Sequence, residues 1–212
     1  MVKLAEMSMH EKYRRAFDAV RAYQAHILPF IEKRSGYPAS LELDSVWQAG
    51  IQPVNDKSLD AEKYETAYSN WLWVARCTLD FVTEQMGPED MEQLVQLLVL
   101  LHQRENARVD LALLQLLGDF QGLAEAFLYD LQWMTPLEMG KSQPGKVVGN
   151  VPQCKILEVP ATRLVCAIGC QRMLSIWATQ QLKLNLAVEQ QNGGCRLILT
   201  PKNKSGSPQR HH

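Results

Sequence analysis

The spacing of apolar residues in the N-terminal part of the chain is typical of α-helices. In residues 9–33 apolar side chains recur on one helical face, while most lysine and arginine residues lie off it. Pro29 is expected to kink this helix or to end its first half, because proline removes a backbone donor and clashes with the preceding turn. Residues 39–58 show no such period and are expected to be irregular. The apolar face of the first helix comprises Tyr13, Phe17, Val20, Ile27 and Ile31.

Helices are also predicted for most of the following segment. Asp60 is expected to cap a helix that runs to Met86. Pro88 is expected to open the next helix, which is apolar nearly all round in its second half and should be buried. The polar residues 102–108 are either a solvated continuation of this helix or a turn between two helices. Gly118 is expected to end the apolar segment 109–117, and one more helix is predicted at residues 120–133.

The pattern changes beyond residue 134. Residues 135–152 are rich in glycine and proline and predict a linker or crossover between a helical part, 1–134, and a strand–helix–hairpin unit, 153–200. A unit of about 50 residues has too small a hydrophobic core to fold independently. It is therefore expected to pack on the helical part and to form one domain with it. The predicted fold class is α+β, with a helical N-terminal part packed on a small antiparallel sheet with one crossing helix. Residues 201–212 are read as a flexible tail.

The strand–helix–hairpin unit is predicted from short runs of branched residues. Two short strands precede a helix, and two more strands form a hairpin after it. Asn192 and Gly193 indicate a tight turn between the last two strands, since a primed turn needs a positive φ at both positions. The strands are expected at residues 156–159, 163–168, 186–189 and 195–199.

Composition and charge narrow the classes of function. The chain has 212 residues, 46% of them hydrophobic, and a net charge of −1, which argues against nucleic-acid binding through bulk phosphate attraction. The longest apolar run, about eight residues, is far shorter than the roughly 20 that a membrane span needs. No signal-peptide pattern opens the sequence. We therefore expect a soluble cytoplasmic protein whose five cysteines are thiols or metal ligands.

Four cysteines fall beyond the predicted linker and carry most of the candidate chemistry. Cys166, Cys170 and Cys195, together with Glu189, could bind zinc if they converge, because thiolates and carboxylates are zinc ligands. Cys170 or Cys166 could instead serve as the nucleophile of an enzyme. The alternative is that these residues, and Cys154, are small buried hydrophobic side chains, as free cysteines often are.

The arrangement of Cys166, Glu189 and the Gly-Gly-Cys entry to the last strand resembles the C-terminal module of 4-vinyl-reductase-type (hydrocarbon-binding) domains. That family's motif has a cysteine before the helix, a glutamate at the end of the next strand, a cysteine shortly after it, and another past the turn. Here Cys166, Glu189 and Cys195 match, whereas residues 190–192 lack the third cysteine. The chain is also broadly similar to aminothiazoline-carboxylate-hydrolase-like proteins. The first resemblance implies binding of small hydrophobic or aromatic molecules, with a zinc site in some members.

Aromatic residues are the candidates for a ligand pocket. Their side chains could line a pocket for a flat ligand, or they could pack with one another in the core. The residues predicted to bind the ligand are Tyr68, Trp71, Phe127, Trp133 and Trp177.

Three functions follow from these features. The favoured one is a protein that binds a hydrophobic, aromatic or tetrapyrrole-like small molecule and acts in sensing, carriage or biosynthetic assistance. The second is a structural or assembly factor that binds a protein partner or forms a homodimer. The third is a cysteine-dependent enzyme, although no specific catalytic motif is present.

Overall fold

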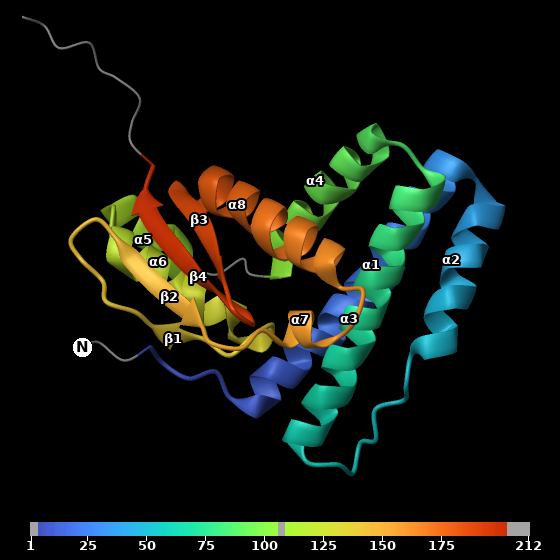
Figure 1. The fold of residues 1–212 in the computed structure, drawn as a ribbon, viewed down its shortest axis with the longest axis horizontal. Helices are drawn as coiled ribbons and strands as arrows, with labels where there is room; N and C mark the ends of the chain where they lie inside the picture. Colours follow the sequence, from blue (N-terminus) through green and yellow to red (C-terminus); the bar gives the residue numbers. More distant parts are fainter. Residues whose placement is uncertain (1–3, 106–108, 203–212) are drawn as a thin grey trace, which may run out of the picture.

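The computed structural model describes residues 4–105 and 109–202. The chain forms a group of helices packed beside a four-stranded antiparallel sheet, which confirms the predicted α+β class (Figure 1). The long helices lie on one side of the molecule in Figure 1, and the sheet lies on the other. The part of the predicted tail from residue 203 onward lies outside the described residues.

The helical part is built on α1 and α3, which pack along each other. α1 continues through Pro29 without ending, and Ser8 caps it by accepting a hydrogen bond from the backbone N–H of Glu11 at 3.1 Å. Asp60 is the first residue of α3 and Leu59 occupies the cap position, one residue earlier than predicted. The bounds are α1 Met9–Ser35, α2 Tyr37–Gly50, α3 Asp60–Gln85 and α4 Pro88–Glu105.

The prediction that residues 39–58 are irregular is wrong for their first half, where α2 lies. Pro38 occupies the first turn of α2, where its fixed φ favours a helix, so it begins this helix instead of only ending α1. The buried residues of α2 are Ser40, Leu43 and Trp47, whose spacing is helical. Exposed apolar residues such as Leu41 flank this short buried stripe. The sequence of α2 therefore separates an apolar face from a polar face less clearly than the sequences of the longer helices do.

The sheet has the strand order β1-β2-β4-β3, and every neighbouring pair is antiparallel. β1 and β2 lie within residues 135–152, so the predicted linker contributes half of the strands. β2 pairs with β4 from Val147↔Leu199 to Val151↔Cys195, which places it inside the sheet between β1 and β4. The bounds are β1 Glu138–Met139, β2 Val147–Val151, β3 Leu184–Gln191 and β4 Gly194–Pro201.

One continuous helical segment, residues 165–182, joins β2 to β3 and is the predicted crossing helix. It begins as a wide π-type helix, η2 (Val165–Met173), and continues through α8 (Leu174–Trp177) into η3 (Ala178–Leu182). It packs against α3 and α4 on one side and against β3 on the other. The crossing helix therefore fills the seam between the helical part and the sheet.

The strands predicted at residues 156–159 and 163–168 are wrong. The first forms a short helix, α7 (Lys155–Glu158), and the second is the start of the crossing helix. Val165 and Met173 are buried eight residues apart, which is a helical spacing, and the contacts with α4 outweigh the strand preference of branched residues.

The predicted turn between β3 and β4 is confirmed in place but differs in type. Gly193 has a φ of +75°, whereas Asn192 is not among the residues with positive φ. One positive φ at the second turn position fits a type II turn better than a primed turn. Gly194 is needed for a separate reason, because a Cβ atom there would collide with the backbone oxygen of Val151 in β2.

The inner face of the sheet is covered by α6 and the crossing helix. Leu128 of α6 lies against Gly149, where a Cβ atom would clash with its side chain. On the outer face, Glu189 and Arg196 are paired across β3 and β4. The remaining helical elements are α5 Val109–Leu117, α6 Phe120–Asp130 and η1 Leu131–Trp133.

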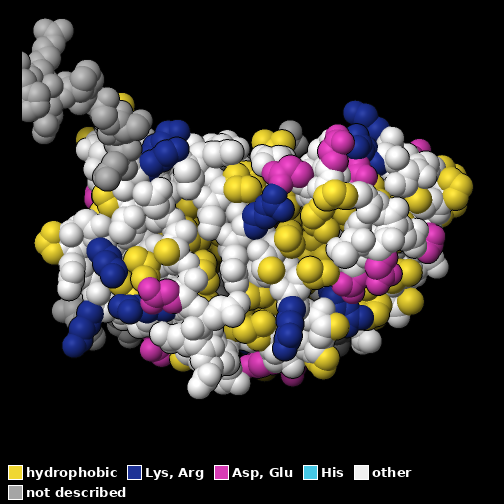
Figure 2. Space-filling model, turned by 45° about the horizontal axis from the view of Figure 1, so that its top comes forward, with side chains coloured by type: hydrophobic (Ala, Val, Ile, Leu, Met, Phe, Trp, Pro, Cys, Tyr) yellow, Lys and Arg dark blue, Asp and Glu magenta, His cyan; other side chains and the backbone are white. Residues whose placement is uncertain are grey.

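The surface carries charges of both signs. Figure 2 shows basic and acidic side chains intermixed on the displayed face, with apolar side chains between them. The charges on this face therefore do not form one large patch of a single sign.

His102, near the C-terminal end of α4, is buried in the core. Its ring meets that of Trp177 edge-on, with ring centroids 4.5 Å apart, and Trp177 in turn stacks on Phe127. Burial, helped by the positive charge of Arg15, lowers the pKa of His102 to about 4. The imidazole is therefore neutral in the folded protein at pH 7.

We expect His102 to make stability depend on pH. Its pKa rises from about 4 in the folded state to the usual 6.5 on unfolding, so the unfolded state binds more protons between these values. Stability is complete above about pH 6.5 and falls as the pH drops toward 4. His102 should contribute about 2 kcal/mol to the loss of unfolding free energy from pH 7 to pH 5. In urea unfolding, the His102→Phe variant should lose less unfolding free energy between pH 7 and pH 5 than the wild type, by about 2 kcal/mol. Identical pH profiles of the two proteins would contradict the low pKa of His102.

Candidate functional site

Four cysteines from three separate segments surround a small void at the seam. Cys154 precedes α7, Cys166 and Cys170 lie on the crossing helix, and Cys195 lies on β4. The void has a volume of about 40 Å³ and is otherwise mainly apolar. Its apolar lining includes Leu131, Met134, Val151, Ile156, Leu174 and Leu197. We call this space the thiol void.

The structure brings together three of the four predicted zinc ligands and separates the fourth. Glu189 lies on the outer face of the sheet, because side chains alternate along β3 and its neighbours Val188 and Gln190 line the thiol void. Its carboxylate lies 3.7 Å from the guanidinium of Arg196. Within residues 4–105 and 109–202, no group of three or more histidine, cysteine, aspartate or glutamate residues is placed to hold a metal ion.

Three of the thiols at the void, those of Cys166, Cys170 and Cys195, are held in their protonated form. Burial raises the pKa of Cys195 to about 11 and the pKa of Cys170 well above its usual value, and the neighbouring cysteines add to both effects. Burial also raises the pKa of Cys166, although a hydrogen bond from Gln171 partly opposes the rise. These thiols therefore act as small, weakly polar side chains at neutral pH.

The five aromatic residues predicted to bind a ligand pack mainly with one another. The ring centroids of Tyr68 and Trp71 are 5.5 Å apart, and those of Trp71 and Trp133 are 4.9 Å apart. Phe127 and Trp177 form a second, stacked pair at 5.2 Å. All five are buried and none lines the thiol void; Trp71 and Trp133 line a separate narrow void of about 50 Å³. Their arrangement is that of aromatic core packing.

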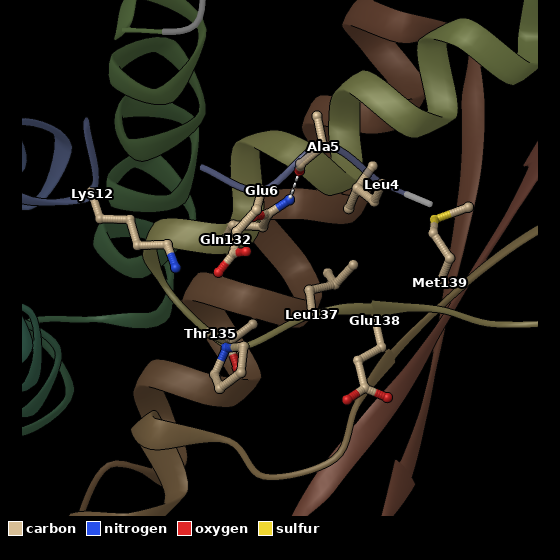
Figure 3. A pocket seen from close by; sticks show the side chains of 10 residues that line it. Leu4, Ala5, Glu6, Lys12, Gln132, Thr135, Leu137, Glu138 and Met139 are labelled. Atoms are coloured by element: carbon tan, nitrogen blue, oxygen red, sulfur yellow. Dashed lines mark hydrogen bonds between the residues drawn. The ribbon is translucent and has the colours of Figure 1, made fainter. Parts of the chain in front are cut away.

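A larger cleft lies on the other side of the segment that follows η1. Its volume is about 560 Å³, and it is bordered by the N-terminal segment and by residues 135–139 (Figure 3). Apolar side chains from Leu4, Leu137 and Met139 share the lining with Glu6, Lys12 and Glu138. We call this space the outer cleft.

Gln132 holds the N-terminal wall of the outer cleft in place. Its side-chain oxygen accepts a hydrogen bond from the backbone N–H of Met7 at 2.8 Å. Its amide donates to the carbonyl of Ala5 at 2.7 Å (Figure 3). Both bonds involve backbone groups of a segment without regular secondary structure, so one buried amide side chain fixes the position of that wall.

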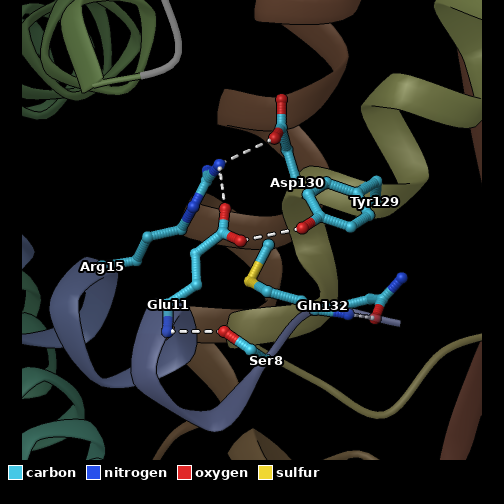
Figure 4. A network of polar contacts seen from close by, with 7 residues as sticks. Ser8, Glu11, Arg15, Tyr129, Asp130 and Gln132 are labelled. Atoms are coloured by element: carbon cyan, nitrogen blue, oxygen red, sulfur yellow. Dashed lines mark hydrogen bonds and ion pairs between the residues drawn. The ribbon is translucent and has the colours of Figure 1, made fainter. Parts of the chain in front are cut away.

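A partly buried polar network lies next to this clamp. Arg15 of α1 contacts both Glu11 and the fully buried Asp130, each at 3.1 Å, and the Tyr129 hydroxyl donates to Glu11 at 2.8 Å (Figure 4). The network ties α1 to the end of α6. Because the charge of the buried Asp130 is paired with that of Arg15, removing either partner would leave an uncompensated charge at this junction.

Thr135 lies in the wall between the two spaces, since it lines both the outer cleft and the thiol void. It is 9% exposed, and its hydroxyl oxygen is buried with no hydrogen-bond partner in the described part of the chain. A buried hydroxyl without a partner is costly and rare in folded proteins. In the sequence, Thr135 only marked the start of the predicted linker, so neither it nor Gln132 stood out.

Hydrogen bonds from α3 fix the segment that carries Thr135. The hydroxyl of Tyr64 donates to the carbonyl of Trp133 at 2.8 Å, and that of Tyr68 donates to the carbonyl of Met134 at 3.0 Å. The backbone N–H of Thr135 also bonds to the carbonyl of Leu131. The floor shared by the outer cleft and the thiol void is therefore rigidly positioned.

Comparisons with protein-family models, curated proteins and solved structures gave no match to this chain. The resemblance to hydrocarbon-binding domains thus stays a prediction, and function is inferred from the geometry of the site. Among the described residues, no helix combines the length and apolar character that crossing a membrane requires.

The raised pKa values predict slow thiol chemistry in the folded protein. Cys195 should carry about 100-fold less thiolate at neutral pH than an ordinary cysteine, because its pKa is about 11 instead of 9.0. Alkylation by iodoacetamide at pH 7.5, followed by peptide mass spectrometry, should therefore be about 100-fold slower at Cys195 in the native protein than in urea. One thiol at the void that reacts faster in the native state would contradict this and favour a cysteine-dependent enzyme.

Proposed function

We propose that this chain is a cytoplasmic binding protein for a small, mainly apolar molecule, which it carries or senses. The observation that carries the proposal is a ligand-sized cleft with a mixed apolar and polar lining, backed by a void that cysteine and aliphatic side chains line. Small-molecule sites are commonly concave, mainly apolar and supplied with a few convergent polar groups.

Of the outer cleft and the thiol void, the outer cleft has the volume that a ligand needs. About 560 Å³ lies within the range of roughly 300–1,000 Å³ typical of small-molecule sites, whereas about 40 Å³ has room for little more than a water molecule. The thiol void then lies behind Thr135, which separates it from the outer cleft.

The thiols support binding more than catalysis. A cysteine nucleophile needs a lowered pKa, usually from a neighbouring cation or a hydrogen-bonded base. Here burial and the neighbouring thiols raise the pKa values of Cys170 and Cys195.

A second candidate function, binding of a protein partner or of another copy of the chain, is favoured by α5. Leu113, Leu116 and Leu117 are 55%, 83% and 70% exposed and lie on one face of that helix. Exposed apolar faces of this kind often mark interaction surfaces. Light scattering after size-exclusion chromatography should then show a dimer, and Leu116→Asn should convert it to a monomer. A monomeric wild-type protein would rule out the homodimer.

The test of small-molecule binding uses the neutral fluorescent probe N-phenyl-1-naphthylamine. We expect saturable binding with one site per chain, and a roughly 10-fold weaker affinity in Leu137→Asn, which replaces an apolar side chain of the cleft by a polar one of similar size. The measurement is a fluorescence titration at constant protein concentration.

The same substitution at α5, Leu116→Asn, is the matched control. Leu116 is exposed and lies outside both the outer cleft and the thiol void, so its replacement should leave the titration unchanged. Absence of saturable binding, or a loss caused by Leu116→Asn and not by Leu137→Asn, would refute binding in the cleft.

A further inference from the structure

We infer that the free edge of β3 binds β3 of a second copy of this chain, so that the two sheets join into one antiparallel sheet about a twofold axis. We call this contact the β3 edge contact. It is independent of the small-molecule binding proposed above, and it involves a different element from the exposed apolar face of α5.

The two edges of the sheet differ in how open they are to another strand. The strand order places β1 at one edge and β3 at the other (Figure 1). β1 has two residues, whereas β3 has eight and pairs with β4 in an unbroken register. Long edge strands are commonly protected by a proline, a lysine or a bulge, because their unpaired backbone groups bind other strands. Residues 184–191 contain none of these, and their one charged side chain, that of Glu189, is paired with Arg196 of β4.

The register of the hairpin shows which backbone groups face the edge. Lys183 and Lys202 lie opposite each other where the paired strands end, and the backbone N–H of Lys202 donates to the carbonyl of Lys183 at 2.9 Å. In an antiparallel ladder every second pair is hydrogen-bonded, and the residues between these pairs turn their N–H and C=O groups to the other side. The residues of β3 that face the edge are therefore Leu184, Leu186, Val188 and Gln190. On that side, the described part of the chain supplies no strand to pair with them.

The edge groups are self-complementary about an axis through Ala187. Antiparallel pairing about this axis places Leu184 opposite Gln190 of the second copy, and Leu186 opposite Val188 of the second copy. Each of these pairs exchanges two backbone hydrogen bonds, so the edge groups of both copies are satisfied. An axis through a neighbouring residue leaves either Leu184 or Gln190 without a residue of β3 opposite it. The ladder is therefore most complete in this one register.

The side chains fit the same register. Asn185, Ala187 and Glu189 share the outer face, because side chains alternate along a strand. In the dimer Glu189 lies opposite Asn185 of the second copy, and the two Ala187 side chains face each other, so no like charges meet directly. On the inner face Leu186 and Val188 are only half-buried in the single chain. Pairing places each of them beside the other in the second copy, which removes apolar surface from water.

The lengths of the two edges also limit the assembly to two chains. A twofold contact uses the same surface of both copies, so the long edge of each is occupied once the dimer forms. The edges that remain are the two-residue β1 strands at the two ends of the joined sheet. Very short edge strands pair poorly with further chains. The β3 edge contact therefore closes a dimer.

The first test places a charge at the axis. Ala187→Glu sets two carboxylates opposite each other, beside Glu189 of both copies, and should weaken the dimer by about 5-fold. Ala61→Glu, at an exposed position in the first turn of α3, is the matched control and should leave the dimer unchanged. Sedimentation-velocity ultracentrifugation over a series of concentrations gives the monomer–dimer dissociation constants. Ala187 is itself exposed, so both variants should fold, which thermal unfolding checks.

The second test examines the register. The twofold axis creates the Asn185–Glu189 pair twice, so Asn185→Lys should tighten the dimer by about 5-fold and Asn185→Glu should weaken it by a similar factor. High salt should reduce both differences, because the charges involved are exposed and therefore screened. A dimer that Asn185→Lys and Asn185→Glu weaken equally would overturn the proposed register.

Backbone protection gives a third measurement. Amide hydrogen exchange in fragments that cover residues 184–191 should be slower in the wild-type dimer than in Ala187→Glu at the same concentration, because the edge N–H groups are bonded across the contact. A wild-type protein that is monomeric at every concentration would overturn the β3 edge contact, as would equal dissociation constants for Ala187→Glu and Ala61→Glu. A dimer that Leu116→Asn dissociates and Ala187→Glu does not would place the contact on α5 instead.

Discussion

Two buried tyrosine hydroxyls position the segment around which the rest of the molecule is arranged. Tyr64 and Tyr68, one helical turn apart on α3, donate to the consecutive carbonyls of Trp133 and Met134. These bonds satisfy backbone groups where η1 ends and the chain turns toward β1. They fix the junction between the helical part and the sheet, and the thiol void and the outer cleft lie on the two sides of Thr135, the next residue along.

The cysteines illustrate how surroundings decide the chemistry of a residue. Cys154, Cys166, Cys170 and Cys195 converge from three segments, yet the sheet turns Glu189 to its opposite face, away from them. For Cys166, Cys170 and Cys195 the apolar surroundings favour the uncharged thiol. The cysteines, which by residue type suggested a metal centre or a nucleophile, therefore line a mainly apolar void.

Helices with a long, regular apolar period were predictable from the sequence, and shorter elements were not. α1 and α3 form where they were predicted, because each buries one face along many turns. Of the apolar face predicted for α1, Val20, Ile27 and Ile31 are buried, whereas Phe17 is exposed. α2 and the start of the crossing helix were missed, since a few apolar residues fit either a helix or a strand until their contacts are known. β2 was missed because its glycine-rich surroundings indicate a linker, and its pairing with β4 is a long-range contact.

The sequence by itself determined the α+β class, the crossing helix between strands, and the place of the β3–β4 turn, because local periodicity and glycine chemistry act over a few residues. Only the tertiary structure decided which polar groups meet. Gln132 makes hydrogen bonds to residues 125 and 127 positions away in sequence. Thr135 lines two spaces whose other walls include residues from near the two ends of the chain. Such partners are set by how elements pack, and packing depends on the whole core rather than on any local pattern.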